Sequence, residues 1–310
     1  MIPGTALVAM SVAAVFAVVS CDPPPPPRDP GTTTARPLTE REQNLLHDAE
    51  ERLTVSCMAS RGFRRWAVLR RPVPEDRDFP YVIDNVKWAA RHGYGSDLQA
   101  RREHLRVSDP NQRYFASLSA ADRQRAVAAL NGEQSAARVE VRLPTGATAG
   151  RYADGCTSQA QERLYGDLTA WFGADMIAGA LPTLRQQQVA GDGRFKAAVK
   201  KWSACMRDRG LRYADPYQAR AAFTGSSAPD TAARQRQEIR TAVAEAECAR
   251  TSGLTATARS LNRRYDARLQ KQYQDAVRDR FWLAHTALPR ARNLLTTKPT
   301  DTTTTIKENQ

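Results

Sequence analysis

The sequence predicts an all-α protein: a helical bundle stapled by disulfides, with a disordered tether before it and a disordered tail after it. Apolar residues recur through most of the chain at the three- to four-residue spacing of an amphipathic helix. Alternation of apolar and polar residues, the pattern of a half-buried strand, is scarce. Besides Cys21 there are four cysteines, an even set that is typical of disulfides in an exported protein.

Residues 1–20 have the features of an export signal. Residues 6–19 form an uncharged apolar stretch that is too short to cross a bilayer as a helix. Cys21 follows Ser20, and this arrangement resembles a bacterial lipoprotein signal, in which the peptide is cut before the cysteine and the thiol carries lipid. Residues 1–4 contain no Lys or Arg, although secretory signals normally begin with positive charge. An ordinary secretory signal that leaves Cys21 free is the alternative.

Residues 21–37 are expected to form a lipid-bearing, disordered tether. The proline run 23–27 cannot continue a helix, because proline lacks an N–H donor and fixes φ, so it favours extended polyproline II. The resemblance to lipoproteins implies a diacylglyceryl group on Cys21, and two acyl chains anchor a protein more stably than one. We therefore expect the protein to be lipid-anchored at the outer face of the cytoplasmic membrane.

A first helical module is expected over residues 38–190. Thr39, with Glu42 three residues later, forms a capping box that predicts a helix start. An apolar stripe at helical spacing follows and ends near Gly62. A second capped helix is expected from Ser119 to a stop at the Asn-Gly pair that ends with Gly132.

The rest of this module is less regular. Residues 81–83 are expected to form a short strand, or residues 84–91 a helical turn, and residues 139–143 alternate weakly, as in a hairpin arm or an extended link. A long helical pattern begins near Asp154. It is expected to break near Gly179 or Pro182, because proline interrupts the hydrogen-bond ladder of a helix.

A second helical module is expected over residues 191–295. Its helices are predicted over residues 192–209, 230–251 and 254–288, each with apolar residues at helical spacing. Residues 296–310 form a Thr-rich tail that is expected to be disordered.

One short pattern occurs twice. Cys57 and Cys205 each begin the sequence Cys-Met-x-x-Arg-Gly-apolar-Arg, and an aromatic residue follows shortly after. A cysteine one turn before a helix end is well placed to staple a later segment onto that helix. Of the three possible connectivities, Cys57–Cys156 with Cys205–Cys248 is therefore favoured, and the chain is expected to hold two related helical modules. Chance similarity in an Arg-rich and Ala-rich chain is the alternative.

The motif, together with a later cysteine in an acidic helix, resembles a family of uncharacterised actinobacterial secreted lipoproteins. The resemblance covers most of the mature chain, and the cysteine motifs carry nearly all of it. It implies export and disulfides, and it implies no activity, cofactor or catalytic residue.

The chain is strongly basic, with a formal net charge of +13, and only seven of its 46 basic residues are Lys. Arg-heavy composition is often a feature of GC-rich genomes, so the excess is not by itself a binding signal. A basic exterior does favour anionic neighbours, such as phospholipid head groups or wall polymers. Nucleic acid is not expected as a partner, since no nucleic-acid motif occurs and the protein is expected outside the cytoplasm.

The sequence predicts no catalytic residue, no metal site and no cofactor. The cysteines show no Cys-x-x-Cys pair, and the histidines show no His-x-x-x-His pair. Trp88, His92 and Ser96 are the least weak candidate cluster, although residues 93–96 are more typical of a turn than of a nucleophile elbow. The four histidines are scattered: His47, His92, His104 and His285.

Two further groups are expected to be structural. The five tryptophans are expected mainly in the core, because each buries a large apolar area, with a sugar or peptide groove as the alternative. The pairs Glu50 with Glu51 and Glu245 with Glu247 are expected on solvated helix faces beside the many Arg residues.

Two functions follow as hypotheses. The first is a non-catalytic, membrane-anchored domain that binds an anionic cell-wall polymer or an envelope protein. The second is a cell-wall-modifying enzyme whose site is assembled from distant residues.

Overall fold

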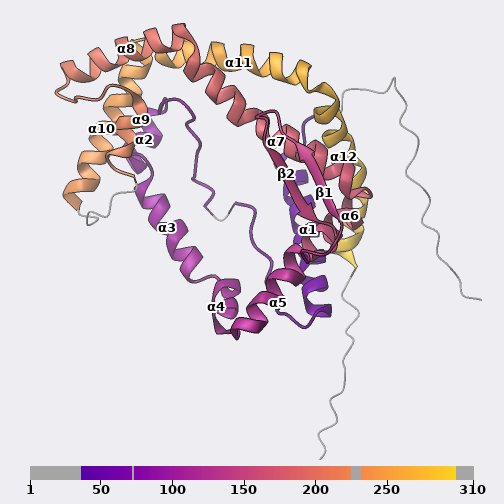
Figure 1. Ribbon diagram of the computed structural model, residues 1–310. Helices are drawn as coiled ribbons and strands as arrows, with labels where there is room; N and C mark the ends of the chain where they lie inside the picture. The colour runs from indigo at the N-terminus through magenta and orange to yellow at the C-terminus, as the bar shows by residue number, and fades with distance from the viewer. Residues whose placement is uncertain (1–35, 72, 225–231, 298–310) are drawn as a thin grey trace, which may run out of the picture. The chain divides into compact units, whose positions relative to one another are not determined.

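The computed structural model describes residues 36–71, 73–224 and 232–297 (Figure 1). The predictions on Cys21, on the tether up to residue 35 and on the tail from residue 298 onward lie outside these residues. Every described residue belongs to one compact unit, Thr34–Gln310. The described part contains twelve helices and one short hairpin, which confirms the all-α prediction. The elements are α1 (Glu40–Ser60), α2 (Val86–His92), α3 (Ser96–Val107), α4 (Pro110–Ser117), α5 (Ala120–Asn131), β1 (Arg138–Arg142), β2 (Thr148–Tyr152), α6 (Cys156–Tyr165), α7 (Leu168–Gly191), α8 (Gly193–Asp208), α9 (Pro216–Ala221), α10 (Ala232–Thr251), α11 (Leu254–Gln272) and α12 (Gln274–Thr296).

The larger hydrophobic core lies among α2, α8, α10, α11 and the last turn of α7. The apolar stripe of α8 enters it with Trp202 and Met206, both fully buried. Val82 and Ile83, from the irregular segment before α2, close one side of the core. Residues 81–83 therefore form an irregular segment and not a strand, and their apolar side chains anchor the loop before α2. The alternative, a helical turn over residues 84–91, is confirmed by α2.

A second core joins α1, α6, α12 and the first turns of α7 (Figure 1). Leu46, Ala49 and Leu53 of α1 point into it, as their helical spacing predicts. The ring of Tyr165 stacks on that of Trp171, with 3.5 Å between the centroids. Both cores combine residues from before and after residue 190, so the expected modules share their hydrophobic interiors.

The predicted capping box at the start of α1 is present. The Thr39 hydroxyl oxygen accepts from the Glu42 N–H at 3.3 Å, and a Glu42 carboxylate oxygen accepts from the Thr39 N–H at 2.8 Å. Residues 139–143 belong to a hairpin arm, since β1 pairs antiparallel with β2 in the register Val139 to Arg151. The hairpin packs against α7.

Both favoured disulfides are present. Cys57 bonds to Cys156 and Cys205 bonds to Cys248, with Cα–Cα distances of 5.6 and 5.7 Å. Each links a helix end to a helix that lies 99 or 43 residues later in the chain. No described helix is both long enough and apolar enough to cross a membrane.

Two helix boundaries differ from those predicted. The helix α7 continues through Pro182 to Gly191, so the expected break is wrong. A break falls instead at Gly166, a left-handed residue that ends α6. The single helix expected over residues 254–288 is two helices that meet at Tyr273.

Candidate functional site: an arginine cleft beside helix α11

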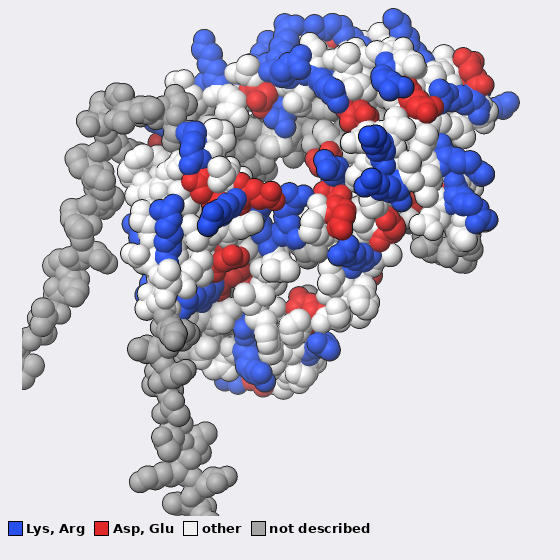
Figure 2. Space-filling model, turned by 180° about the vertical axis from the view of Figure 1, so that it is seen from behind, with Lys and Arg blue, Asp and Glu red and all other residues white. Residues whose placement is uncertain are grey.

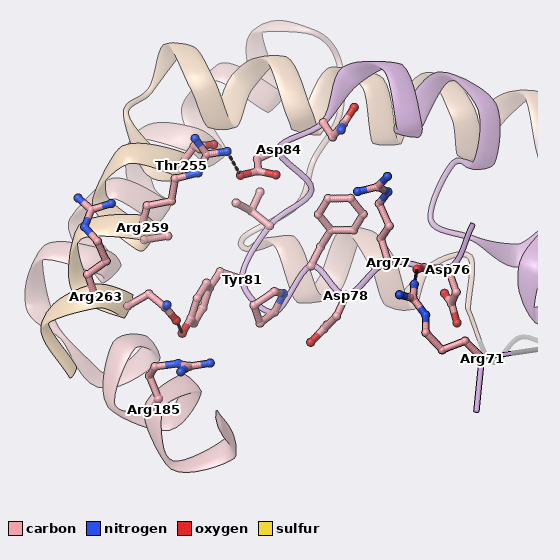
Figure 3. Close-up of a pocket in the computed structure, with 16 residues that line it drawn as sticks. Arg71, Asp76, Arg77, Asp78, Tyr81, Asp84, Arg185, Thr255, Arg259 and Arg263 are labelled. Atoms are coloured by element: carbon pink, nitrogen blue, oxygen red, sulfur yellow. Dashed lines mark hydrogen bonds and ion pairs between the residues drawn. The ribbon is translucent and has the colours of Figure 1, made fainter. Parts of the chain in front are cut away.

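A cleft of about 620 Å³ lies between α11 and the irregular segment 76–85 (Figure 3). Pro74 and Pro80 keep this segment out of a helix, because each removes an N–H donor and restricts the preceding residue. The segment is nevertheless fixed in place. Its Ile83 side chain is buried, and the Ile83 N–H donates to a Glu245 carboxylate oxygen at 2.9 Å. The cleft wall is thus a loop held by the core of the protein.

Positive charge dominates the lining. The cleft contains five arginines from three parts of the chain and three aspartates. We call it the arginine cleft, after these five residues: Arg71, Arg77, Arg185, Arg259 and Arg263. In Figure 3, Arg259 and Arg263 project from α11, Arg185 comes from α7, and Arg77 comes from the loop.

Some of this charge is neutralised within the protein. Arg259 pairs with Asp84 at 2.7 Å, and Arg185 pairs with Asp266. Arg77 and Arg263 form no ion pair with any residue in the described part of the chain. Two arginines in one cleft therefore keep their charge available to an anion from outside.

The floor of the cleft carries aromatic and polar groups. The Tyr81 hydroxyl donates to the Asn262 side-chain oxygen at 2.7 Å, and the Tyr81 ring lies edge-on to that of Phe195 at 5.9 Å. Partial burial raises the pKa of Tyr81 above its usual value, so the hydroxyl stays protonated at neutral pH. Among the described residues, the buried Arg185 Nε and Thr255 Oγ1 atoms lack a hydrogen-bond partner. The cleft can thus offer a bound molecule cationic, hydroxyl and aromatic contacts.

The cluster Trp88, His92 and Ser96 does not line this cleft. His92 Nδ1 lies 2.8 Å from an Asp97 oxygen, while the Ser96 hydroxyl donates to Glu238. Ser96 is therefore held by a buried carboxylate and not by the imidazole of His92. The turn predicted over residues 93–96 is confirmed, with Gly93 and Gly95 at φ of 58° and 92°.

The tryptophans are partly as expected. Trp88, Trp171 and Trp202 are buried, and Trp66 and Trp282 are half-buried. None of the five lines the arginine cleft.

The expectation of solvated carboxylate faces is wrong for two residues. Glu245 is fully buried, and burial raises its pKa to about 7. Burial also raises the pKa of Glu50, which accepts from the Gln161 amide at 2.8 Å. Glu247 matches the expectation, since its side chain is 36% exposed and pairs with Arg209 at 2.5 Å. Glu51 also pairs with an arginine, Arg65 at 3.0 Å, but its side chain is only 13% exposed.

No protein-family model, curated protein or solved structure matches this chain. Its function has to be inferred from its own residues. Among those described, no three or more His, Cys, Asp or Glu side chains are grouped so as to hold a metal ion.

The arginine cleft is only partly predictable from the sequence. Arg259 and Arg263 are four residues apart in a predicted helix, so their shared face was readable from the spacing. Arg77 lies 186 positions before Arg263 in a proline-rich loop, and no local pattern brings these two residues together.

Proposed function

We propose that this protein is a lipid-anchored, extracytoplasmic protein that binds an anionic polymer of the cell envelope through the arginine cleft. The single observation that carries the proposal is a pair of arginines without an ion-pair partner among the described residues, Arg77 on the loop and Arg263 on α11, which both line one cleft. An arginine guanidinium is always charged and presents a planar fork of donors that matches carboxylate and phosphate oxygens.

The charge around the cleft supports a polymer rather than a small ion. Figure 2 shows Lys and Arg side chains along the upper edge of the molecule, where α8 and α11 run. On α11, Arg268 and Lys271 are exposed and form no ion pair with any described residue. A stripe of cations that leads to a cleft concentrates a polyanion near it, and the effect falls as salt rises.

The location rests on the sequence of the first 37 residues. The apolar stretch, Cys21 and the proline run together resemble a lipoprotein signal with its tether. Such an anchor would keep the binding domain next to the polymers of the envelope.

The proposal is tested by co-sedimentation of the full-length protein with purified cell walls over a series of salt concentrations. We expect binding that weakens steeply with salt. The double variant R77Q/R263Q should bind about tenfold more weakly, a loss of roughly 1.4 kcal/mol. R264Q is the matched control, because Arg264 is the exposed neighbour of Arg263 on the same helix and does not line the cleft.

Two outcomes of the co-sedimentation experiment would contradict the proposal. If R264Q weakens binding as much as R77Q/R263Q, the charge acts diffusely and the cleft is not the site. If the protein does not bind walls even at low salt, the anionic polymer is the wrong ligand, and an envelope protein becomes the better partner.

A further inference from the structure

The two copies of the cysteine motif end their helices in the same way. The helices α1 and α8 end at aligned residues, and the following Gly62 and Gly210 have φ of 82° and 78°. After each glycine, an apolar residue donates its N–H back to the methionine carbonyl of the motif at 2.9 Å, Phe63 in one copy and Leu211 in the other. The surroundings of the two helix ends can therefore be compared residue by residue.

In the first copy, two cationic side chains contact other groups of the protein. The guanidinium of Arg64 lies over the Trp66 ring, 4.9 Å from the centroid. Arg52, farther back on α1, donates to the carbonyl oxygens of Leu295, at 3.2 Å, and of Thr297. Both cations thus have partners within the chain.

The second copy keeps cations at both positions but lacks these partners. Lys200 is aligned with Arg52, Arg212 with Arg64, and Ala214 stands where the first copy has Trp66. Lys200 and Arg212 are exposed, and neither forms an ion pair or a hydrogen bond with a described residue. Because the Ala214 side chain is small, the space beside Arg212 is not filled by an aromatic ring.

A cavity of about 510 Å³ occupies this place. We call it the α8-end pocket, and none of the residues that line it is acidic. Arg207 supplies a third cation, and its guanidinium is steadied by a 3.2 Å hydrogen bond to the Ser203 hydroxyl. Ser203 is buried and in turn donates to the Tyr213 carbonyl oxygen at 2.6 Å. The lining residues are Lys200, Ser203, Arg207, Arg212, Tyr213 and Ala214.

We propose that the α8-end pocket binds a phosphoryl group. Three cations around one cavity repel one another unless an anion lies between them, and no carboxylate of the lining plays that part. Two guanidinium forks and an ammonium match the several oxygens and the double charge of a phosphate better than a single carboxylate. This site goes beyond the arginine cleft, with which it shares no lining residue.

The test is calorimetric titration of the full-length protein with inorganic phosphate, at constant ionic strength maintained with sodium chloride. We expect saturable binding that K200Q/R212Q weakens at least tenfold. The matched control K201Q/R250Q removes the same charges from the neighbouring position on α8 and from an exposed position on α10. It should change the affinity by less than twofold, as should R77Q/R263Q.

The variant A214W tests the pocket without changing the net charge of the protein. A214W restores the aromatic residue of the first copy and should abolish phosphate binding while leaving all three cations in place. Absence of saturable binding by the unaltered protein would overturn the proposal, as would equal losses in K200Q/R212Q and K201Q/R250Q. Retention of phosphate binding by A214W would also contradict the site.

Two further titrations identify the source of the phosphoryl group. Tighter binding of glycerol 3-phosphate than of poly(glycerol phosphate) would assign the pocket to free phosphate monoesters, and the reverse would assign it to the diesters of a polymer. The R77Q/R263Q variant separates this proposal from the preceding one. It should lose wall binding through the arginine cleft and retain the phosphate affinity of the α8-end pocket.

Discussion

At the scale of single residues, two buried carboxylates on α10 hold the chain on both sides of α2. Glu238 accepts from the N–H groups of Tyr94 and Ser96 at 2.7 and 3.2 Å. Glu245 accepts from the Ile83 N–H at 2.9 Å and from the Tyr94 hydroxyl at 2.7 Å. These bonds satisfy backbone donors that no strand or helix partner reaches, and they compensate in part for the removal of two carboxylates from water. The bond from Ile83 to Glu245 holds the loop that walls the arginine cleft, although Glu245 does not line the cleft.

The raised pKa of Glu245 predicts a pH dependence of stability. Its pKa is about 7 in the folded protein, against an ordinary value of 4.5, chiefly because burial disfavours the charged form. Between these two values the folded state binds more protons than the unfolded state, so the free energy of unfolding should fall as pH rises from about 4.5 to 7. A shift of this size corresponds to roughly 3 kcal/mol.

Urea denaturation of E245Q at several pH values checks this expectation. The variant should lose most of the decline, because glutamine does not titrate. Some decline should remain, since burial also raises the pKa of Glu50. E247Q is the control, because Glu247 lies near the surface and pairs with Arg209. A decline in E245Q as steep as that of the unaltered protein would contradict the role given to Glu245.

At the scale of elements, each copy of the repeated motif ends a helix and supplies one cysteine of a disulfide. In each copy the motif arginine contacts the segment that carries the partner cysteine. Arg61 donates to the Asp154 carbonyl at 2.6 Å, and Arg209 pairs with Glu247 at 2.5 Å. The copies differ beyond this point, because Cys156 begins α6 whereas Cys248 lies in the last turns of α10. The internal similarity is confined to the helix end and its disulfide.

The terminating glycine predicts a measurable cost of substitution. Gly210 has φ of 78° with nothing near the place of a Cβ, so G210A suffers only from backbone strain. A left-handed conformation costs an L-residue roughly 1–2 kcal/mol. G179A is the matched control, because Gly179 lies within α7, also has open space around it, and has ordinary helical geometry. It should stabilise the protein by about 0.5–1 kcal/mol.

Thermal and urea unfolding of the two variants measure the difference. Equal effects of G210A and G179A would show that the left-handed glycine is not what ends α8. The disulfide remains intact in both variants, so a change in its pairing cannot account for the result.

The boundaries of α7 and α11 differ from those that local sequence preferences predict. A proline inside a helix costs about 3 kcal/mol, yet α7 passes through Pro182. The helix is held from several sides by α6, α11 and α12, and Leu181 and Val189 are buried along it. Packing over its whole length outweighs the loss of one hydrogen bond. The break at Tyr273, in contrast, has no glycine or proline to announce it.

At the scale of the whole molecule, cations dominate a surface whose carboxylates are partly withdrawn into the interior. Glu238 and Glu245 are buried, while Lys and Arg stay exposed on α8 and α11. This division makes the described exterior more basic than the composition alone implies. It also explains why two separate cation-lined cavities can form on one chain.

Attachment of the whole protein to the membrane is predicted to depend on Cys21. If Cys21 carries lipid, the variant C21A should move from the membrane fraction to the medium when the cells are fractionated. Its circular dichroism should be unchanged, since the described residues belong to one compact unit that does not include Cys21. C21A that stays in the membrane fraction would contradict the lipid anchor.

The helical class, the favoured pairing of the four cysteines, the helix-ending motifs and the capping box of α1 were all predictable from the sequence. Each depends on residues close together in the chain or on cysteines with few possible pairings. Only the tertiary structure places residues 81–83 in an anchored loop, buries Glu245, and brings Arg77 and Arg263 to the lining of one cleft. The physical reason is that burial and charge pairing depend on which distant segments share a core, and periodicity does not record which face of a helix meets which loop.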